Sequence, residues 1–218
     1  MKGSTKGPAA GIYVMAGTNG AGKSSVGGAA IREKGADYFN PDEAARRIRA
    51  TNPHVSERDA NIAGWQEGKR LLEEAIAKRL VFAIETTLGG KTIIALLLRA
   101  LADGLEVRMW YVGLATPELH LARVRARVAR GGHGIPENRI RERYDRSRVN
   151  LIRLLPHLTE LRLFDNSLDA DPASGTAPIP VLVLHTVNGQ ITTICDLAQV
   201  PKWAKPIVAA AMRSSKAR

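Results

Sequence analysis

The segment from residue 11 to residue 25 constrains the fold of this chain more than any other. An apolar run, Ile12 to Ala16, leads directly into Gly17-Thr18-Asn19-Gly20-Ala21-Gly22-Lys23-Ser24. This is a complete G-x-x-x-x-G-K-[ST] phosphate-binding loop. Its glycines allow backbone N–H groups to approach phosphate oxygens, and the helix that follows adds its positive N-terminal end. The segment therefore predicts a buried strand, a phosphate-binding loop and a helix that together bind a nucleoside triphosphate.

Each position of this loop has a predicted role. Lys23 is expected to reach the β- and γ-phosphates, and Ser24 is expected to offer its hydroxyl to Mg²⁺. The residues predicted to contact the nucleotide are Gly17, Thr18, Asn19, Gly20, Ala21, Gly22, Lys23, Ser24 and Ser25.

Size and composition favour one α/β domain. The chain has 218 residues, of which 44% are hydrophobic and 24% are charged, as in soluble globular proteins. No apolar stretch approaches the length of a membrane span, and Met1 to Ala9 lacks the apolar core of a secretion signal. The lone Cys195 cannot form an internal disulfide. These features predict a cytoplasmic protein.

The order of the expected elements predicts the fold class. Strands are expected at 11–16, 37–39, 80–84, 107–112 and 161–164, with helices near 23–33, 43–51, 58–78, 91–103, 117–130 and 136–155. The third of these helices is supported by apolar spacing at Ile62, Trp65, Leu72, Ala75 and Ile76. Five strands alternating with helices indicate a P-loop kinase-type doubly wound parallel five-stranded sheet, whose ligand lies at the carboxyl ends of the strands.

Three regions follow from this pattern. Residues 1–10 are expected to form an extended or disordered tail, and residues 11–170 a P-loop kinase domain with a lid at about 118–155. Residues 171–218 are expected to add a C-terminal β-hairpin, with strands 181–186 and 190–195, and a short helix to the same domain.

Acidic side chains follow three of the expected strands. Asp42 is the candidate general base of a phosphoryl-transfer reaction, although it could instead cap the next helix. Glu85 ends an apolar strand, where a charge is costly unless it meets a metal, a polar ligand or a cation. Thr87 could bond a substrate hydroxyl or start the following helix. Asp165 is the alternative metal-side acid.

The formal charge of +11 is concentrated in one stretch, with ten arginines and four acidic residues between Glu118 and Arg153. Spacing of i, i+4, i+7 places two arginine trios on helix faces, which indicates a closing lid that stabilises the transferring phosphoryl group. The trios are Arg123, Arg127 and Arg130, and Arg139, Arg143 and Arg146. Arg125, Arg141 and Arg148 are expected to be solvated.

A phosphate-backbone footprint for RNA or DNA is the alternative interpretation of this stretch. Tyr144 is its only aromatic residue, so base stacking is poorly supported. The chain also lacks an Asn-Lys-x-Asp guanine reader and a Leu-Ser-Gly-Gly segment, which argues against a GTPase and a transporter-type ATPase. A compact domain with a base candidate and an arginine lid suits a small-molecule kinase.

The ordered set of motifs resembles the zeta toxin family, in its short bacterial branch. Besides the phosphate-binding loop, the matching segments are Phe39-Asn-Pro-Asp42, Ile84-Glu-Thr-Thr-Leu88, Gly131-Gly-His-Gly-Ile-Pro-Glu137 and Arg143-Tyr-Asp-Arg-Ser147, followed by Asn150-Leu151. Together they span roughly residues 11 to 167.

This resemblance implies ATP- and Mg²⁺-dependent phosphorylation of a hydroxyl on a nucleotide sugar, typically the 3′-hydroxyl of UDP-N-acetylglucosamine. It implies that Asp42 is the base, that Glu85 and Thr87 contact substrate or metal, and that Arg130 and Arg143 contact the phosphates. It also implies a protein antitoxin as partner. Family members commonly carry an arginine two residues after the threonine, where this chain has Gly89-Gly90-Lys91.

The leading hypothesis is therefore a cytoplasmic ATP-dependent kinase that acts on a nucleotide sugar. Its predicted substrate-binding residues are Asn40, Asp42, Glu85, Thr87 and Lys91, its metal ligands are Ser24 and Glu85, and its catalytic residues are Asp42, Lys23, Arg130 and Arg143. A nucleic-acid-binding ATPase is the second hypothesis. A kinase of another nucleoside, sugar or dinucleotide is the third.

Overall fold

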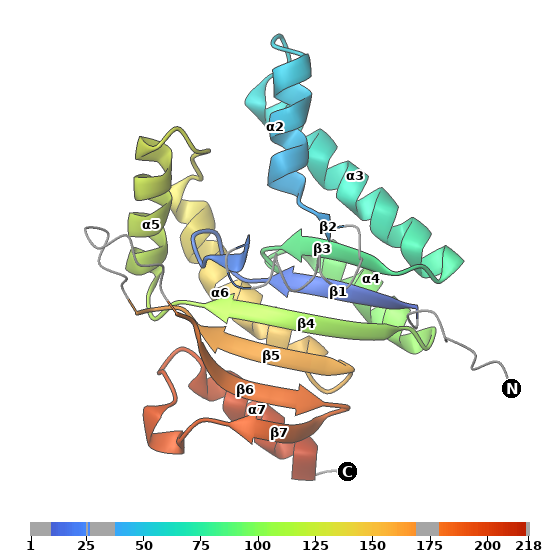
Figure 1. Cartoon of the computed structure of the whole chain (residues 1–218), viewed down its shortest axis with the longest axis vertical. Coiled ribbons are helices and arrows are strands. Elements are labelled where there is room, and N and C mark those ends of the chain that lie inside the picture. Colours follow the sequence, from blue (N-terminus) through green and yellow to red (C-terminus); the bar gives the residue numbers. More distant parts are fainter. Residues whose placement is uncertain (1–9, 25, 27–37, 169–178, 217–218) are drawn as a thin grey trace, which may run out of the picture.

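A mostly parallel β-sheet organises the chain (Figure 1), which confirms the predicted α/β fold class. The computed structural model describes residues 10–24, 26, 38–168 and 179–216. Five strands run parallel in the order β2-β3-β1-β4-β5. Their bounds are β1 Gly11–Ala16, β2 Tyr38–Phe39, β3 Phe82–Thr86, β4 Glu106–Gly113 and β5 Glu160–Asp165.

The C-terminal hairpin extends this sheet. Strand β6 (Val181–Val187) pairs antiparallel with β5, and β7 (Gln190–Ile194) pairs antiparallel with β6. The turn at Asn188 and Gly189 has φ values of 50° and 76°, as a two-residue hairpin turn requires. The sheet thus has seven strands within the described residues, which are the five predicted parallel strands and the two strands of the predicted hairpin, whose joining to the sheet was not predicted. The hairpin covers β5, whose backbone would otherwise form an exposed edge.

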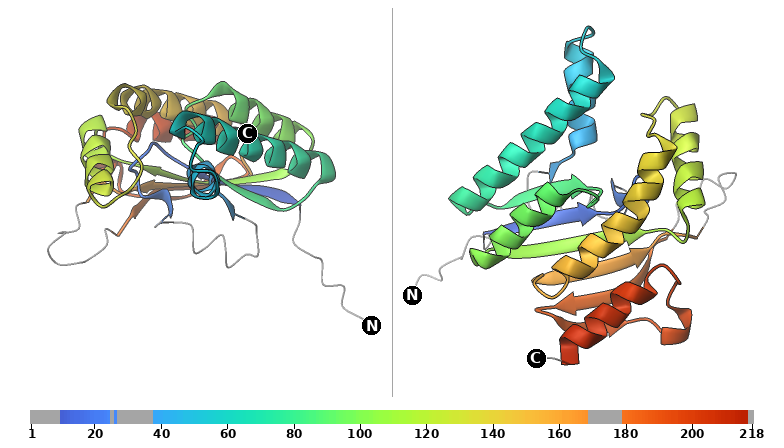
Figure 2. Two further views of the ribbon diagram at one scale, coloured as in Figure 1. Left: turned by 90° about the horizontal axis from the view of Figure 1, so that it is seen from above. Right: turned by 180° about the vertical axis from the view of Figure 1, so that it is seen from behind.

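Six α-helices have their full bounds within the described part of the chain. They are α2 Pro41–Thr51, α3 Glu57–Lys78, α4 Lys91–Ala102, α5 Pro117–Ala129, α6 Glu137–Leu154 and α7 Lys205–Lys216. Figure 2 shows α4, α6 and α7 on one face of the sheet. Several predictions lie outside the described residues: the tail at 1–9, the expected helix at 23–33 beyond Val26, and the loop at 169–178.

The main core lies between the sheet and these helices. Ile12 and Val14 of β1 pack in one buried cluster with Leu97 of α4 and Leu151 of α6. Each fully buried side chain of this size contributes roughly 1.5–3 kcal/mol relative to an exposed one. The ring of Trp203 joins the same cluster and stacks on Tyr111 of β4, with ring centroids 6.2 Å apart. This packing fixes the strand ends from which the site is built.

Helices α2 and α3 form an antiparallel pair that rises beyond the β2–β3 edge of the sheet (Figure 1). Their close approach depends on glycine, because a Cβ atom on Gly64 would lie 2.6 Å from the Pro41 carbonyl oxygen. A Cβ atom on Gly68 would lie 2.7 Å from the Phe39 ring. The glycine face of α3 is therefore the buried one. Of the apolar residues whose spacing predicted this helix, Leu72, Ala75 and Ile76 are buried, whereas Ile62 and Trp65 are 44% and 43% exposed.

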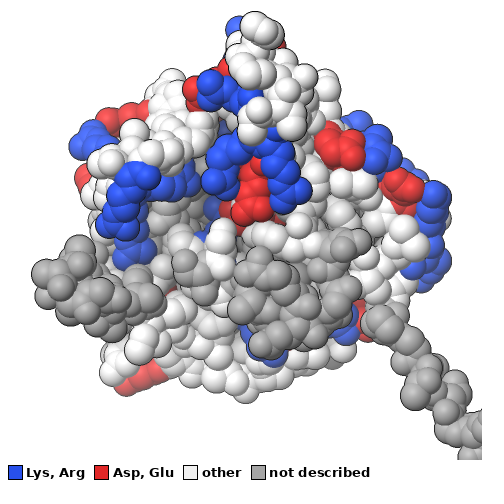
Figure 3. Space-filling model, turned by 45° about the horizontal axis from the view of Figure 1, so that its top comes forward, with Lys and Arg blue, Asp and Glu red and all other residues white. Residues whose placement is uncertain are grey.

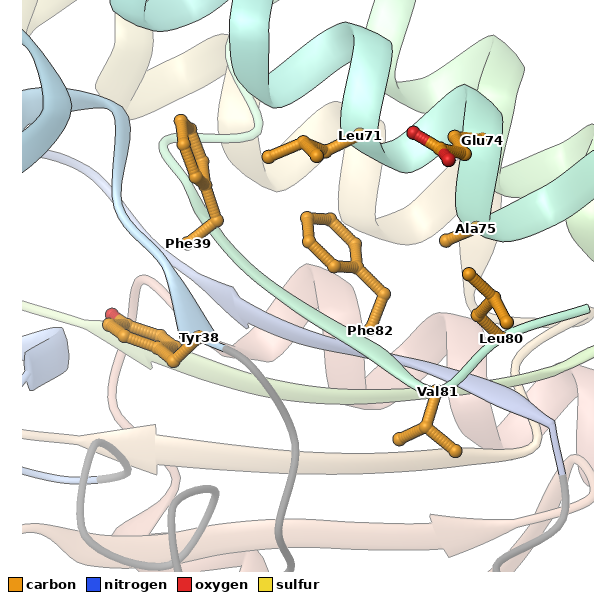
Figure 4. Close-up of a pocket in the computed structure, with 8 residues that line it drawn as sticks. All are labelled: Tyr38, Phe39, Leu71, Glu74, Ala75, Leu80, Val81 and Phe82. Carbon is orange, nitrogen blue, oxygen red and sulfur yellow. The ribbon is translucent and has the colours of Figure 1, made fainter. Parts of the chain in front are cut away.

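At the opposite, amino end of β3, a smaller hollow of about 300 Å³ lies between the strand and α3 (Figure 4). The rings of Phe39 and Phe82 and the side chain of Leu71 point into it, and Glu74 lies at its rim. Being away from the carboxyl ends of the strands, this hollow takes no part in the site described next.

Among the helices of the described residues, none combines the length and the apolar character needed to cross a membrane.

Candidate active site at the carboxyl ends of the strands

The phosphate-binding loop follows β1 and has the backbone that its glycines predict. Gly17, Gly20 and Gly22 all have positive φ, at 139°, 84° and 85°. The ammonium group of the buried Lys23 donates a 2.8 Å hydrogen bond to the Gly17 carbonyl oxygen. The lysine thus folds back across the loop, where it can exchange this contact for a phosphate oxygen.

His120 of α5 supports the loop from one side. Its Nδ1 atom lies 2.8 Å from the Asn19 carbonyl oxygen, so Nδ1 carries the proton and donates. Burial lowers the pKa of this histidine to about 4, which keeps the ring neutral near pH 7. A Cβ atom on Gly20 would lie 2.8 Å from the His120 carbonyl oxygen, so glycine also permits this approach. The sequence contains no signal that singles out His120.

Asn166 supports the loop from the end of β5. Its side-chain amide donates a 2.9 Å hydrogen bond to the Ala21 carbonyl oxygen, and a Cβ atom on Gly22 would lie 2.5 Å from the same nitrogen. The preceding Asp165 points elsewhere, because it accepts hydrogen bonds from Ser167 and, at 3.1 Å, from the indole of Trp203. The structure therefore gives no support to Asp165 as the metal-side acid.

Glu85 of β3 connects the loop to β2. One carboxylate oxygen lies 3.4 Å from the Lys23 ammonium group. The other accepts hydrogen bonds from Ser24 at 3.1 Å, from the Asn40 amide at 3.2 Å and from the Tyr38 hydroxyl. Burial and the Glu85 charge raise the pKa of Tyr38 above its ordinary value. The carboxylate is 11% exposed, so the penalty for burying its charge is met by four donors.

The predicted metal ligands, Ser24 and Glu85, lie together in this cluster. A hydroxyl and a carboxylate oxygen 3.1 Å apart suit an oxygen-preferring cation such as Mg²⁺, which usually takes one or two protein oxygens and completes its shell with phosphates and water. In the described residues no group of three or more His, Cys, Asp or Glu side chains could hold a metal without such help. The donor set thus fits a cation that arrives with a nucleotide.

Asp42 lies in the first turn of α2, and the structure separates its two possible roles. The side chain of Asn40 caps the helix, since its oxygen accepts from the backbone N–H groups of Asp42 and Glu43 at 2.9 and 3.3 Å. The N-cap of α2 is therefore Asn40 and not Asp42. The side chain of Asp42 lines the cleft described below and interacts electrostatically with Arg143.

Arg143 of α6 is the lid arginine held closest to the loop. Its guanidinium donates a 2.7 Å hydrogen bond to the Asn19 side chain, and its carbonyl oxygen accepts from Thr18 at 3.4 Å. Burial lowers the pKa of Arg143, which nevertheless stays charged at neutral pH. Arg130, the other predicted phosphate contact, is exposed at the end of α5 and is not among the residues that line the cleft.

Other arginines of the lid are engaged with acidic neighbours. Arg125 and Arg141, which were expected to be solvated, are exposed and pair with Glu137 at 3.3 and 2.8 Å. The same expectation is wrong for Arg148, which is half-buried over the Tyr144 ring with its guanidinium carbon 4.1 Å from the centroid. Figure 3 shows acidic side chains interspersed with basic ones over much of the visible face, apart from a basic group over α5.

The segment after β3 is fixed by its own side chains. Leu88 is buried with a positive φ of 56°, its N–H is bonded to the Thr86 hydroxyl at 3.1 Å, and its carbonyl accepts from Asn150 at 2.7 Å. This anchor places Thr87 in the lining of the cleft. Lys91, predicted to replace an arginine at the substrate, is exposed in the first turn of α4 and is not among the lining residues.

These residues surround one cleft of about 1130 Å³ between the α2–α3 pair and the α5–α6 lid. Single-ligand pockets commonly measure about 300–1,000 Å³, so this cleft has room for two substrates. Lys23, Asn40, Asp42, Glu85, Thr87 and Arg143 all line it, as do Arg139 and Arg146. Ser25 lies outside the described residues. The sequence prediction missed one wall of the cleft, which α3 supplies through Arg58, Asn61, Ile62, Trp65 and Gln66.

The loop between α5 and α6 reaches across to α3. Nδ1 of His133 lies 2.6 Å from Oε1 of Glu57, the first residue of α3. The carbonyl oxygen of His133 accepts a 2.7 Å hydrogen bond from Arg127, which ties the loop back to α5. His133, Ile135 and Pro136 line the cleft on this side. This loop thus connects the α2–α3 pair with the α5–α6 lid.

Comparison with known proteins places this chain among related ones. A family model described as "Zeta toxin" matches residues 2–166. An uncharacterized protein of Haemophilus influenzae is 34% identical over 132 residues, which cover 59% of this chain and 88% of that protein.

Two solved structures share the fold. The structure of AvrRxo1-ORF1:-ORF2 with ATP has a TM-score of 0.63 at 15% identity and covers 92% of this chain, which spans 63% of that longer chain. The PezAT chromosomal toxin-antitoxin system of Streptococcus pneumoniae gives a TM-score of 0.56 at 14% identity, covering 100% of this chain and 90% of that chain. At this level of identity the likeness concerns the fold alone.

Proposed function

This chain belongs to the zeta toxin family, and we propose that it transfers the γ-phosphoryl group of ATP to a hydroxyl of a nucleotide sugar. The family and the phosphate-binding loop make it a P-loop small-molecule kinase. The acceptor that we propose is UDP-N-acetylglucosamine, through its 3′-hydroxyl. The observation that carries the proposal is the placement of Asp42 in the cleft lining, with Asn40 as the helix cap and Arg143 facing the carboxylate.

In the proposed reaction the acceptor hydroxyl oxygen attacks the γ-phosphorus while the bond to the β–γ bridging oxygen breaks and ADP leaves. Asp42 accepts the hydroxyl proton and aligns the oxygen for attack. Lys23 and Arg143 stabilise the charge on the phosphoryl oxygens, Arg143 from a position fixed by its contact with Asn19. Such positioning and charge stabilisation supply most of the rate in phosphoryl transfer.

Ser24 and Glu85 are the residues that we propose hold Mg²⁺. Mg²⁺ held there would supply positive charge that offsets the negative charge of the nucleotide phosphates. The remaining donors to Glu85, from Tyr38 and Asn40, keep the carboxylate oriented toward the loop whether or not a cation is present. The Lys23 ammonium group lies 3.4 Å from the other oxygen of this carboxylate.

A protein antitoxin is part of the same proposal. The support for a partner is that the fold is shared with the PezAT toxin-antitoxin system. We propose that such a partner inhibits the enzyme by covering the nucleotide side of the cleft. Copurification with the product of an adjacent gene, and loss of ATP binding in that complex, would support this part of the proposal.

The nucleic-acid-binding alternative gains little from the structure. A phosphate-backbone footprint needs arginines that are free to pair with phosphates. Arg125, Arg139, Arg141 and Arg146 instead pair with glutamates of the lid. Arg143 is turned into the cleft.

Mass spectrometry of small-molecule products tests the proposal. The protein is incubated with Mg²⁺-ATP and a panel of nucleotide sugars, nucleosides, free sugars and dinucleotides. Asp42→Asn should abolish the product yet keep ATP binding, whereas Lys23→Ala should impair both. Glu43→Gln is the matched control, since Glu43 is the neighbouring acid and its carboxylate faces Arg46 and Arg47.

The panel separates the alternatives. Phosphorylated UDP-N-acetylglucosamine that is absent with Asp42→Asn supports both the acceptor and the base. Phosphorylation of another panel member keeps the kinase and replaces the acceptor. Release of ADP without a phosphorylated product would favour the nucleic-acid-dependent ATPase, and full turnover by Asp42→Asn would overturn the assignment of the base.

A further inference from the structure

One wall of the cleft carries exposed apolar side chains that the phosphoryl-transfer chemistry does not use. Arg58, Asn61, Ile62 and Trp65 of α3 follow the spacing i, i+3, i+4, i+7, which places them on one helical face. All four line the cleft. The contacts of Gly64 with Pro41 and of Gly68 with Phe39 fix the rotation of α3 so that this face cannot turn into the core.

The side chains of this wall have the chemistry of a nucleobase site. The indole of Trp65 is 43% exposed and offers a broad aromatic surface, and Ile62 adds an apolar neighbour. Stacking of a base on an aromatic side chain contributes about 1–3 kcal/mol. The amides of Asn61 and Gln66 can both donate and accept, as the edge of a base requires. Arg58 adds a cation suited to a phosphate group.

The wall lies on the acceptor side of the site. Gly64 packs against Pro41, whose neighbour Asp42 is the proposed base, and Trp65 is the residue after that glycine. An acceptor whose hydroxyl meets Asp42 can therefore extend along α3. The loop carrying His133 lines the same cleft and contacts the start of α3 at Glu57.

We propose that Trp65 is the stacking surface for the nucleobase of the acceptor, and that α3 thereby selects nucleotide-linked acceptors over free sugars and sugar phosphates. This inference rests on the proposed function for the identity of the ligand as acceptor. Trp65 would thus determine specificity for the nucleobase, which neither the phosphate-binding loop nor the acids at the strand ends would recognise. Trp65 itself takes no part in the transfer step.

Tryptophan fluorescence reports on this site directly. The chain has three tryptophans, and Trp110 and Trp203 are only 4% and 3% exposed, so Trp65 is the one a ligand in the cleft can reach. The phosphate-binding loop is first saturated with Mg²⁺ and a non-hydrolysable ATP analogue. The protein is then titrated with UDP-N-acetylglucosamine, UMP and N-acetylglucosamine 1-phosphate. We expect saturable quenching by the first two, no quenching by the third, and loss of the signal in Trp65→Phe.

Kinetics give the second readout. With the acceptor identified by the product panel, Trp65→Ala should raise its KM about 10-fold, the equivalent of one lost stacking contact, with little change in kcat. Trp65→Phe should restore most of the affinity because it retains an aromatic ring. Val149→Ala, which removes an exposed apolar side chain from α6 outside the cleft lining, is the matched control and should leave KM unchanged.

The two hypotheses fail in different ways. A product panel without any phosphorylated acceptor overturns the proposed function, while the fluorescence titration still decides whether Trp65 binds a base. An active enzyme whose Trp65 fluorescence ignores UDP-N-acetylglucosamine and UMP overturns the inference. So does an unchanged KM in Trp65→Ala.

Discussion

The hydroxyl of Ser24 donates a 3.1 Å hydrogen bond to the carboxylate of Glu85, and this contact joins the phosphate-binding loop to the neighbouring strand. The two residues are 61 positions apart in the sequence and meet because β1 and β3 are adjacent parallel strands. A cation entering with ATP would replace this hydrogen bond by binding both oxygens. The proposed metal site therefore depends on the pairing of these two strands.

Replacing Glu85 by glutamine tests this pair. The variant keeps an oxygen for Ser24, Tyr38 and Asn40 but loses the negative charge that a divalent cation prefers. We expect the Mg²⁺ concentration that gives half-maximal activity to rise about 10-fold or more. Initial rates at fixed ATP across a Mg²⁺ series give this value. A Mg²⁺ dependence identical to that of the wild type would remove Glu85 from the metal site.

Arg143 and Arg130 provide a matched comparison within the lid. Both were predicted to contact phosphates, but only Arg143 lies in the cleft lining. Arg143→Ala should lower kcat/KM by about 100-fold or more, because a positioned arginine stabilises the transferring group. Arg130→Ala removes the same charge from an exposed position and should stay close to the wild-type rate. Equal losses of kcat/KM in the two variants would mean that the total positive charge of the lid, rather than the position of one arginine, determines the rate.

Gly22 should tolerate no side chain. Its φ is +85°, and an added Cβ atom would lie 2.5 Å from the amide nitrogen of Asn166. Gly22→Ala should therefore lose ATP binding and roughly 1–3 kcal/mol of unfolding free energy. Gly104→Ala is the control, since Gly104 has φ of +74° but nothing within 4 Å, and it should keep ATP binding. Urea unfolding and nucleotide titration measure both effects.

His120 should make stability depend on pH. Its pKa falls from 6.5 to about 4 in the folded chain, so the unfolded chain binds more protons between these values and the free energy of unfolding decreases as pH falls from 6.5 toward 4. The full effect is on the order of 3 kcal/mol. His120→Asn keeps an N–H donor for Asn19 without titrating, so its unfolding free energy should decrease less over this range. Parallel pH profiles for the two proteins would contradict this account.

Much of the fold was predictable from local patterns. The phosphate-binding loop, the alternation of strands and helices, and the hairpin turn at Asn188-Gly189 depend on backbone preferences and short-range spacing. These are properties of neighbouring residues. The joining of the hairpin to β5 was not predictable, because the strand that covers an exposed edge is chosen among distant segments.

The residues of the candidate site also fall into those that local sequence predicted and those that tertiary contacts decided. Sequence pattern alone predicted a phosphate-binding loop at Gly17 to Ser24 and placed Asp42 and Glu85 after strands whose ends meet. Tertiary structure alone decided that Arg143 rather than Arg130 faces the loop, that Asn40 takes the helix cap, and that Trp65 lines the cleft. Helical spacing shows which residues share a face but not what that face meets. Here the glycine contacts of α3 leave Ile62 and Trp65 on the side of the helix that lines the cleft.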